Sequence, residues 1–73
     1  MIEIPVVWDG PSPPAARTRV RIMRDADGEK ATVYSSYFVQ LGTTEIPWGI
    51  RTDYFTGLVT EEGRGVMARF YGV

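Results

Sequence analysis

The sequence predicts a mainly β protein, folded as a small antiparallel sheet or partial barrel of four to five strands. The first observation is residues 17–22, where arginine alternates with a β-branched residue at every step. The second is the turn sequence at 25–28, followed by a β-rich run at 30–33. At 73 residues the chain is expected to form one domain, residues 1–73.

Residues 1–8 are expected to form an apolar edge strand or an arm. Apolar side chains lie two residues apart and so share one side of an extended segment: Ile2, Ile4, Val6 and Trp8. Pro5 lacks a backbone donor, which places such a strand at the edge of a sheet or outside it. Residues 9–16 contain three prolines and predict a semi-rigid, Pro-rich connector.

The hairpin after the connector is the clearest local prediction. Thr18, Val20 and Ile22 lie on one face of its first strand, which is the pattern of a half-buried antiparallel strand. The other face is formed by arginines: Arg17, Arg19 and Arg21. Gly28 can adopt a positive φ at the end of the turn.

Beyond residue 32 two interpretations remain open. A strand with a bend near residues 35–36 is preferred, because residues 32–41 are rich in Val, Tyr and Phe. The alternative is an α+β fold with one short helix around 35–41, since apolar residues there also fall at helical spacing. Residues 45–49 predict a loop, whereas 54–60 and 66–71 predict strands.

Composition removes several classes of chemistry. The chain has no cysteine and no histidine, which excludes disulfides, thiolate zinc sites, histidine bases and cysteine nucleophiles. Residues 25–29 resemble the start of a calcium loop, but its sixth and twelfth positions hold Lys30 and Ser36, so an ordinary turn is predicted. We expect no enzyme, no cofactor, no metal and no small-molecule substrate. No apolar run approaches the roughly 20 residues of a membrane span, so we expect no membrane partner and a cytoplasmic protein.

Charge is unevenly distributed along the chain. The net charge is −1, yet residues 17–24 carry four arginines and no acid. These arginines form either a solvated face, paired with the acids at 25, 27 and 29, or a contact with an acidic protein surface or a nucleic-acid backbone. Tyr34 and Tyr37 would add stacking to such a contact.

Two groups of residues are therefore predicted to bind a partner, the N-terminal apolar row and the arginines. Trp and Arg are the residue types most enriched at binding hot spots. For the N-terminal row, the alternative is a strand that completes the core. The predicted partner-binding residues are Ile2, Ile4, Val6, Val7, Trp8, Arg17, Arg19, Arg21 and Arg24.

Over its whole length the chain resembles the small RNA-polymerase-binding transcription inhibitors and antiterminators of lytic Xanthomonas phages. The resemblance rests on the length, on residues 1–8 (MIEIPVVW) followed by 10–14 (GPSPP), and on the arginine-rich composition without cysteine or histidine. It implies a protein in the host cytoplasm that docks on bacterial RNA polymerase, with contact to nascent RNA in the complex as a further option. A single-stranded nucleic-acid-binding domain and a minor subunit of a larger assembly are the alternatives.

Overall fold

The computed structural model describes residues 2–47 and 49–69, and these form seven antiparallel strands without a helix. The mainly β prediction is confirmed, but the predicted number of four to five strands is wrong. The strands are β1 (Ile2–Pro5), β2 (Val7–Trp8), β3 (Arg19–Arg24), β4 (Lys30–Ser35), β5 (Gln40–Glu45), β6 (Tyr54–Val59) and β7 (Gly65–Ala68). The described part of the chain contains no helix that could cross a membrane.

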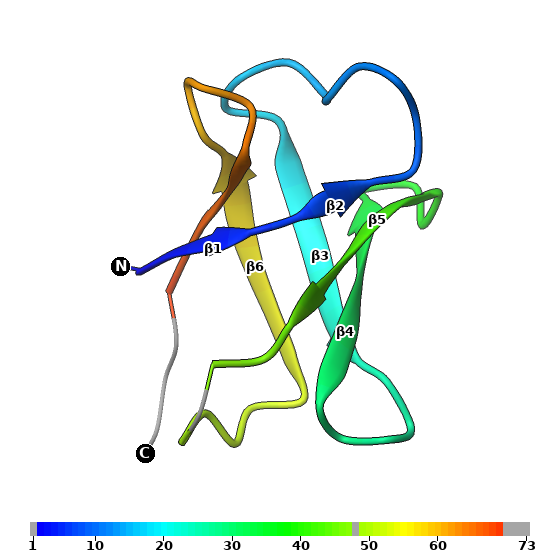
Figure 1. Ribbon diagram of the computed structural model, residues 1–73, viewed down its shortest axis with the longest axis vertical. Helices are drawn as coiled ribbons and strands as arrows, with labels where there is room; N and C mark the ends of the chain where they lie inside the picture. The colour runs from blue at the N-terminus through cyan, green and yellow to red at the C-terminus, as the bar shows by residue number, and fades with distance from the viewer. Residues whose placement is uncertain (1, 48, 70–73) are drawn as a thin grey trace.

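The strands follow one another around the sheet in the order β1-β7-β6-β3-β4-β5-β2. The two ends of this order, β1 and β2, are consecutive in the chain and separated only by Val6. One N-terminal segment therefore pairs with β7 through its first half and with β5 through its second half. Figure 1 shows this segment crossing the front of the molecule, which makes the sheet a nearly closed barrel.

Two glycines permit this close approach of backbones. A Cβ atom on Gly42 of β5 would lie 2.5 Å from the carbonyl oxygen of Val7. A Cβ atom on Gly65 of β7 would clash with the carbonyl oxygen of Ile4. Both positions face the N-terminal segment, so only glycine fits where that segment crosses its two partners. Gly42 also explains why the sequence pattern did not reveal the second half of β5, since glycine is depleted in strands.

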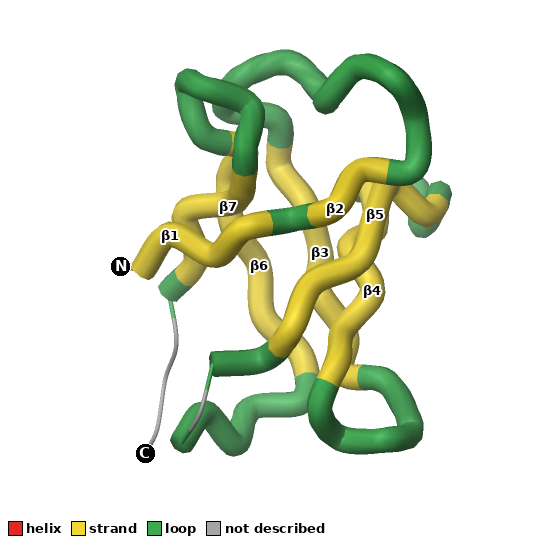
Figure 2. The backbone as a smooth tube through the Cα atoms, viewed as in Figure 1, coloured by secondary structure: helices red, strands yellow, loops and turns green. Residues whose placement is uncertain are grey.

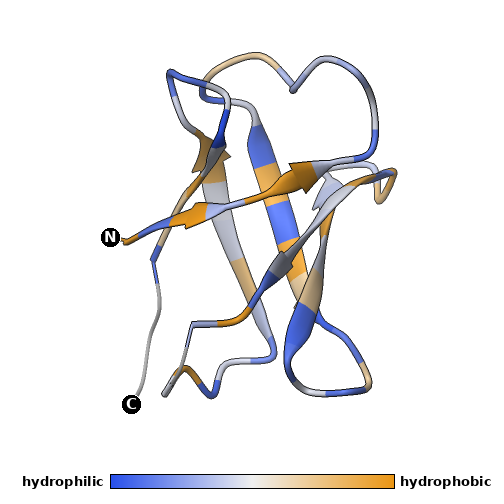
Figure 3. Cartoon of the chain, viewed as in Figure 1, coloured by the Kyte–Doolittle hydropathy of each residue, from blue (hydrophilic) through white to orange (hydrophobic). Residues whose placement is uncertain are grey.

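The barrel interior is filled by small apolar side chains. Its buried residues are Ile4, Val6, Val20, Ile22, Ala31, Val33, Phe55, Val59, Val66 and Ala68. Figure 3 shows the alternation along β3, where hydrophobic and hydrophilic bands follow one another. A narrow barrel leaves room mainly for Val, Ile and Ala, and Phe55 is the only aromatic side chain buried in this core among the described residues.

Residues 35–41 contain a tight turn rather than a helix. Ser36 and Tyr37 form the turn between β4 and β5, so strand rather than helix is confirmed and the α+β alternative is wrong. The chain reverses at this turn, so the single bent strand preferred from the sequence is in fact two antiparallel strands. The Oγ of Ser35 accepts hydrogen bonds from the backbone N–H groups of Tyr37 (3.2 Å) and Val39 (3.1 Å). Ser35 thus stabilises the turn through its side chain.

The connector at 9–18 arches over one end of the barrel, as Figure 2 shows. It is anchored at both ends, because the N–H of Asp9 donates to the carbonyl of Leu41 and the N–H of Arg17 donates to that of Val59.

The predicted strand at 66–71 begins one residue early, at Gly65, and β7 ends at Ala68. Its last two predicted residues, Phe70 and Tyr71, lie outside the described residues.

Candidate functional site

The outward side of β3 and β6 forms one continuous surface, which we call the arginine–aromatic face. Antiparallel pairing places Arg19 opposite Leu58, Arg21 opposite Thr56 and Met23 opposite Tyr54. On the other side of β3, Arg21 lies opposite Tyr34 of β4. The face consists of Arg19, Arg21, Met23, Tyr34, Phe38, Tyr54, Thr56 and Leu58.

Arg21 is held in the middle of this face by two aromatic residues. Its guanidinium carbon lies 4.7 Å from the centroid of the Phe38 ring, which is a cation–π contact. Its Nη1 donates a hydrogen bond to the hydroxyl of Tyr54 at 3.1 Å. Arg19 is exposed, and the described residues give it no ion-pair partner. Arg21 thus has two side-chain partners, whereas Arg19 has no ion-pair partner among the described residues.

The turn between β4 and β5 presents three successive apolar residues to solvent. Tyr37 is 89% exposed, Phe38 57% and Val39 59%. Phe38 has a φ of 63°, in the left-handed region that costs a side-chain-bearing residue about 1–2 kcal/mol. Strained backbone and exposed apolar side chains at one turn are typical of a functional position.

Sequence reasoning did not include Phe38, Val39, Met23, Tyr54 or Leu58 in the site. A signal was present, because residues 37–39 are consecutive and apolar, and a turn cannot bury all three. The outward positions of β6 became recognisable only once β6 was placed beside β3. Pairing with a strand some 35 residues later in the chain is invisible to a local pattern.

Arg24, which was predicted to bind a partner, instead occupies a largely buried structural position in the fold. Its side chain is only 16% exposed. The guanidinium donates to the carbonyl oxygens of Gly28, Ile50 (2.7 Å) and Thr52 (3.2 Å) and to Oδ1 of Asp53 (3.0 Å). These hydrogen bonds join the β3–β4 turn to the loop before β6 and leave Arg24 little capacity for a partner.

Arg17 lies before β3 rather than in the strand. It has a φ of 67°, and its Nε donates to Oε1 of Glu61 at 2.8 Å. Both side chains are largely exposed, so the pair adds little stability. Within the described residues, the ion pairs of these arginines are with Glu61 and Asp53. The solvated-face alternative named the acids at 25, 27 and 29 as partners, and that pairing is wrong.

The N-terminal segment forms β1 and β2, the two end strands of the sheet order, which corresponds to the edge-strand alternative rather than to an arm. Ile4 (1% exposed) and Val6 are buried in the core, which removes them from any partner contact. Trp8 is half-buried, and its Nε1 donates to the carbonyl of Gly63 at 2.8 Å. Ile2 and Val7 point outward and remain available to a partner.

Two hollows accompany these surfaces. A depression of about 390 Å³ lies in the arginine–aromatic face, and its lining includes Arg19, Arg21, Tyr54, Thr56 and Leu58. A larger groove of about 700 Å³ lies between β1 and the end of β5 and is lined mainly by apolar side chains. Its lining includes Ile2, Ile4 and Pro47, with Lys30, Glu3 and Glu45 as its charged groups.

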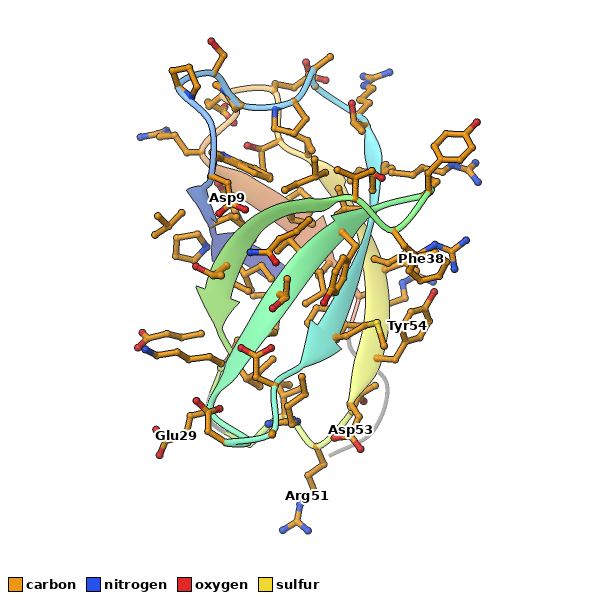
Figure 4. The ribbon with its side chains drawn as sticks, turned by 90° about the vertical axis from the view of Figure 1, so that its right-hand side faces the viewer. Asp9, Glu29, Phe38, Arg51, Asp53 and Tyr54 are labelled. Atoms are coloured by element: carbon orange, nitrogen blue, oxygen red, sulfur yellow. The ribbon has the colours of Figure 1, made fainter. Side chains whose placement is uncertain are left out.

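The arginine–aromatic face itself contains no acidic residue; Asp53, which directly precedes Tyr54, lies at its border and is paired with Arg24. Figure 4 shows Phe38 and Tyr54 on one side of the barrel, Asp9 and Glu29 on the opposite side, and Arg51 at one end. Neither β3 nor β6 contains an acidic residue. The face is therefore locally positive in a chain whose net charge is −1.

The turn at 25–28 is an ordinary hairpin turn. Gly28 has a φ of 79°, as predicted for its position. The carboxylate of Asp27 accepts hydrogen bonds from the N–H groups of Glu29 (2.8 Å) and Lys30 (3.1 Å), which lower its pKa below the ordinary value. No group of three or more His, Cys, Asp or Glu in the described residues is arranged to hold a metal ion.

Comparison of the chain with protein-family models, curated proteins and solved structures gives no match. The geometry alone therefore defines the candidate site as an exposed face that combines arginine with aromatic side chains.

Proposed function

We propose that the chain is a phage-encoded, non-enzymatic regulator that binds bacterial RNA polymerase, inhibits transcription initiation and promotes antitermination. RNA polymerase is proposed as the partner because the sequence resembles those of the phage transcription inhibitors and antiterminators described above. The docking surface is assigned from the structure, to the arginine–aromatic face and the turn beside it. A non-enzymatic role is part of the proposal because the chain lacks histidine and cysteine and its exposed face offers no paired carboxylates.

The observation that carries a docking role is the fixed arrangement around Arg21. Arg and Tyr are enriched at the hot spots of protein interfaces, and here Arg21 is held between Phe38 and Tyr54. A side chain that is already ordered loses less entropy on binding than a mobile one. Exposed apolar groups around it, including Tyr37 and Leu58, supply area that a partner would bury.

Single-stranded nucleic acid is the second candidate. Tyr37 and Phe38 are exposed aromatic rings beside cations, which is the combination that such binders use to stack bases. Only Arg19 and Arg21 contribute charge to this face, however, and the net charge of the chain is −1. A face with two cations on a protein of negative net charge favours a protein partner over a nucleic acid.

Binding to purified core RNA polymerase tests the proposal. The full-length chain is expected to bind core polymerase, to reduce σ-dependent initiation and to increase read-through at an intrinsic terminator. Replacing Tyr37 and Tyr54 by Ala should weaken binding by about tenfold or more, because hot-spot truncations have effects of that size. Arg51→Ala is the matched control, since Arg51 is exposed at one end of the barrel.

A folded wild-type chain that fails to bind core polymerase would refute the proposal. Equal binding by wild type and the Tyr37→Ala, Tyr54→Ala variant would assign docking to another surface. Far-UV circular dichroism of each variant shows whether the β fold is retained before binding is interpreted.

A further inference from the structure

We propose that the arginine–aromatic face binds an extended acidic segment of a protein partner, with an apolar side chain of that segment seated in the depression on β6. This inference rests on the proposed docking function and specifies the chemistry of the segment. Three observations support it: two arginines lie two residues apart on β3, a depression lies beside them, and β3 and β6 contain no acidic residue.

The spacing of the cations suits carboxylates on an extended chain. Arg19 and Arg21 are two residues apart on β3, so their Cβ atoms point to the same face about 7 Å apart. Acidic residues two positions apart on an extended partner have the same repeat. Guanidinium groups pair with carboxylates through two parallel hydrogen bonds, which provides directional recognition.

The depression results from a small residue between two large ones. Thr56 lies between Tyr54 and Leu58 on the outward side of β6, and all three line the hollow of about 390 Å³. Arg19 and Arg21 form its other side. An aliphatic or aromatic side chain placed over Thr56 would contact the ring of Tyr54 and the side chain of Leu58, while its neighbouring carboxylates reach the arginines.

The chain does not neutralise this face itself. β3 and β6 contain no acid, and the two carboxylates nearest their ends are paired with other arginines, Glu61 with Arg17 and Asp53 with Arg24. The contacts of Arg21 are with an aromatic ring and a hydroxyl group, and neither is a carboxylate that would pair with its charge. A partner carboxylate would therefore supply the missing counter-charge.

The test titrates the ¹⁵N-labelled full-length chain with three synthetic peptides and follows backbone amide shifts. The first peptide carries two Glu residues two positions apart, followed by Leu and Phe. The second has Gln for Glu, and the third has Ser for Leu and Phe. We expect the first peptide to shift amides of β3 and β6, including those of Arg21 and Thr56, and the other two to bind about tenfold more weakly.

Variants of the chain localise the effect. Arg19→Ala combined with Arg21→Ala should weaken binding of the first peptide by about tenfold or more, whereas Arg51→Ala should not change it. Equal binding of the Glu and Gln peptides, or shifts confined to other strands, would overturn the inference. Tighter binding of oligouridylate at the same residues would also overturn it and assign the face to single-stranded nucleic acid.

Core polymerase binding by the same variants separates this inference from the proposed function. If polymerase binds wild type and the double arginine variant equally, the acidic segment is refuted and the docking function stands. If polymerase does not bind while the Glu peptide does, the docking function fails and the chemistry of the face is retained.

Discussion

Arg24 joins two loops at the end of the barrel through hydrogen bonds to three carbonyl groups and one carboxylate. Arg24→Ala would leave those carbonyls without their charged donor, so we expect a loss of roughly 2–3 kcal/mol in the free energy of unfolding. Asp53→Asn is the control: the Asp53 side chain is 85% exposed, and exposed pairs contribute little. Urea denaturation of both variants measures the difference; equal losses would show that the carbonyl bonds add no stability.

Phe38 combines a left-handed backbone with an exposed ring, so its effects on stability and on binding can be separated. Phe38→Gly relieves the strained φ and removes the ring, whereas Phe38→Ala removes the ring and keeps the strain. We expect the glycine variant to be about 1 kcal/mol more stable than the alanine variant, while both bind the partner more weakly. Thermal unfolding and polymerase binding provide the two measurements, and undiminished binding by either variant would exclude Phe38 from the docking surface.

At the scale of elements, the N-terminal segment closes the barrel by pairing with β7 and with β5. The side chains reinforce this closure, because the hydroxyl of Thr44 donates to the carbonyl of Pro5 at 2.6 Å. Pro5 is the last residue of β1 and lies opposite Gly65, at the end of the ladder, which is a position where a strand tolerates proline. The segment is thus an integral part of the barrel.

The same isoleucine-to-alanine substitution at two positions of β1 tests whether the strand is part of the core. Ile4→Ala is expected to lower the free energy of unfolding by about 2–4 kcal/mol, because Ile4 is fully buried. Ile2→Ala removes the same atoms from an exposed position on the same strand, so we expect a much smaller loss. Guanidinium denaturation compares the two; similar losses would contradict the closed-barrel arrangement. Polymerase binding by Ile2→Ala then tests whether the outward side of β1 contributes to docking.

For the whole molecule, the distribution of charge determines how the free chain meets nucleic acid. Arg19 and Arg21 are the cations of the face, so RNA binding there would neutralise about two phosphates. Each neutralised phosphate contributes roughly 0.7 to the salt dependence, so the slope of the logarithm of the RNA association constant against log salt concentration should be no steeper than about −1.5. We therefore expect weak binding of the isolated protein to single-stranded RNA near physiological salt. Fluorescence anisotropy over a salt series measures this slope, and tight binding with a steep slope would favour the nucleic-acid alternative.

The sequence by itself determined the β class and the central hairpin. Alternating residues in β3 and the turn at Gly28 act over a few neighbours, so a local pattern contains the necessary information. It also placed Arg19 and Arg21 on an outward face. The larger strand number was not predictable, because β5 contains Gly42 at a crossing that only the folded chain reveals.

Tertiary structure alone decided which of the candidate residues can meet a partner. Ile4 and Ile2 are the same residue type two positions apart, yet one is buried and the other exposed. Arg24 continues the arginine series of β3, but loops from distant parts of the chain surround it. Burial and hydrogen bonding depend on strands and loops that lie from 26 to 66 residues away in the sequence, and a local pattern carries no information about them.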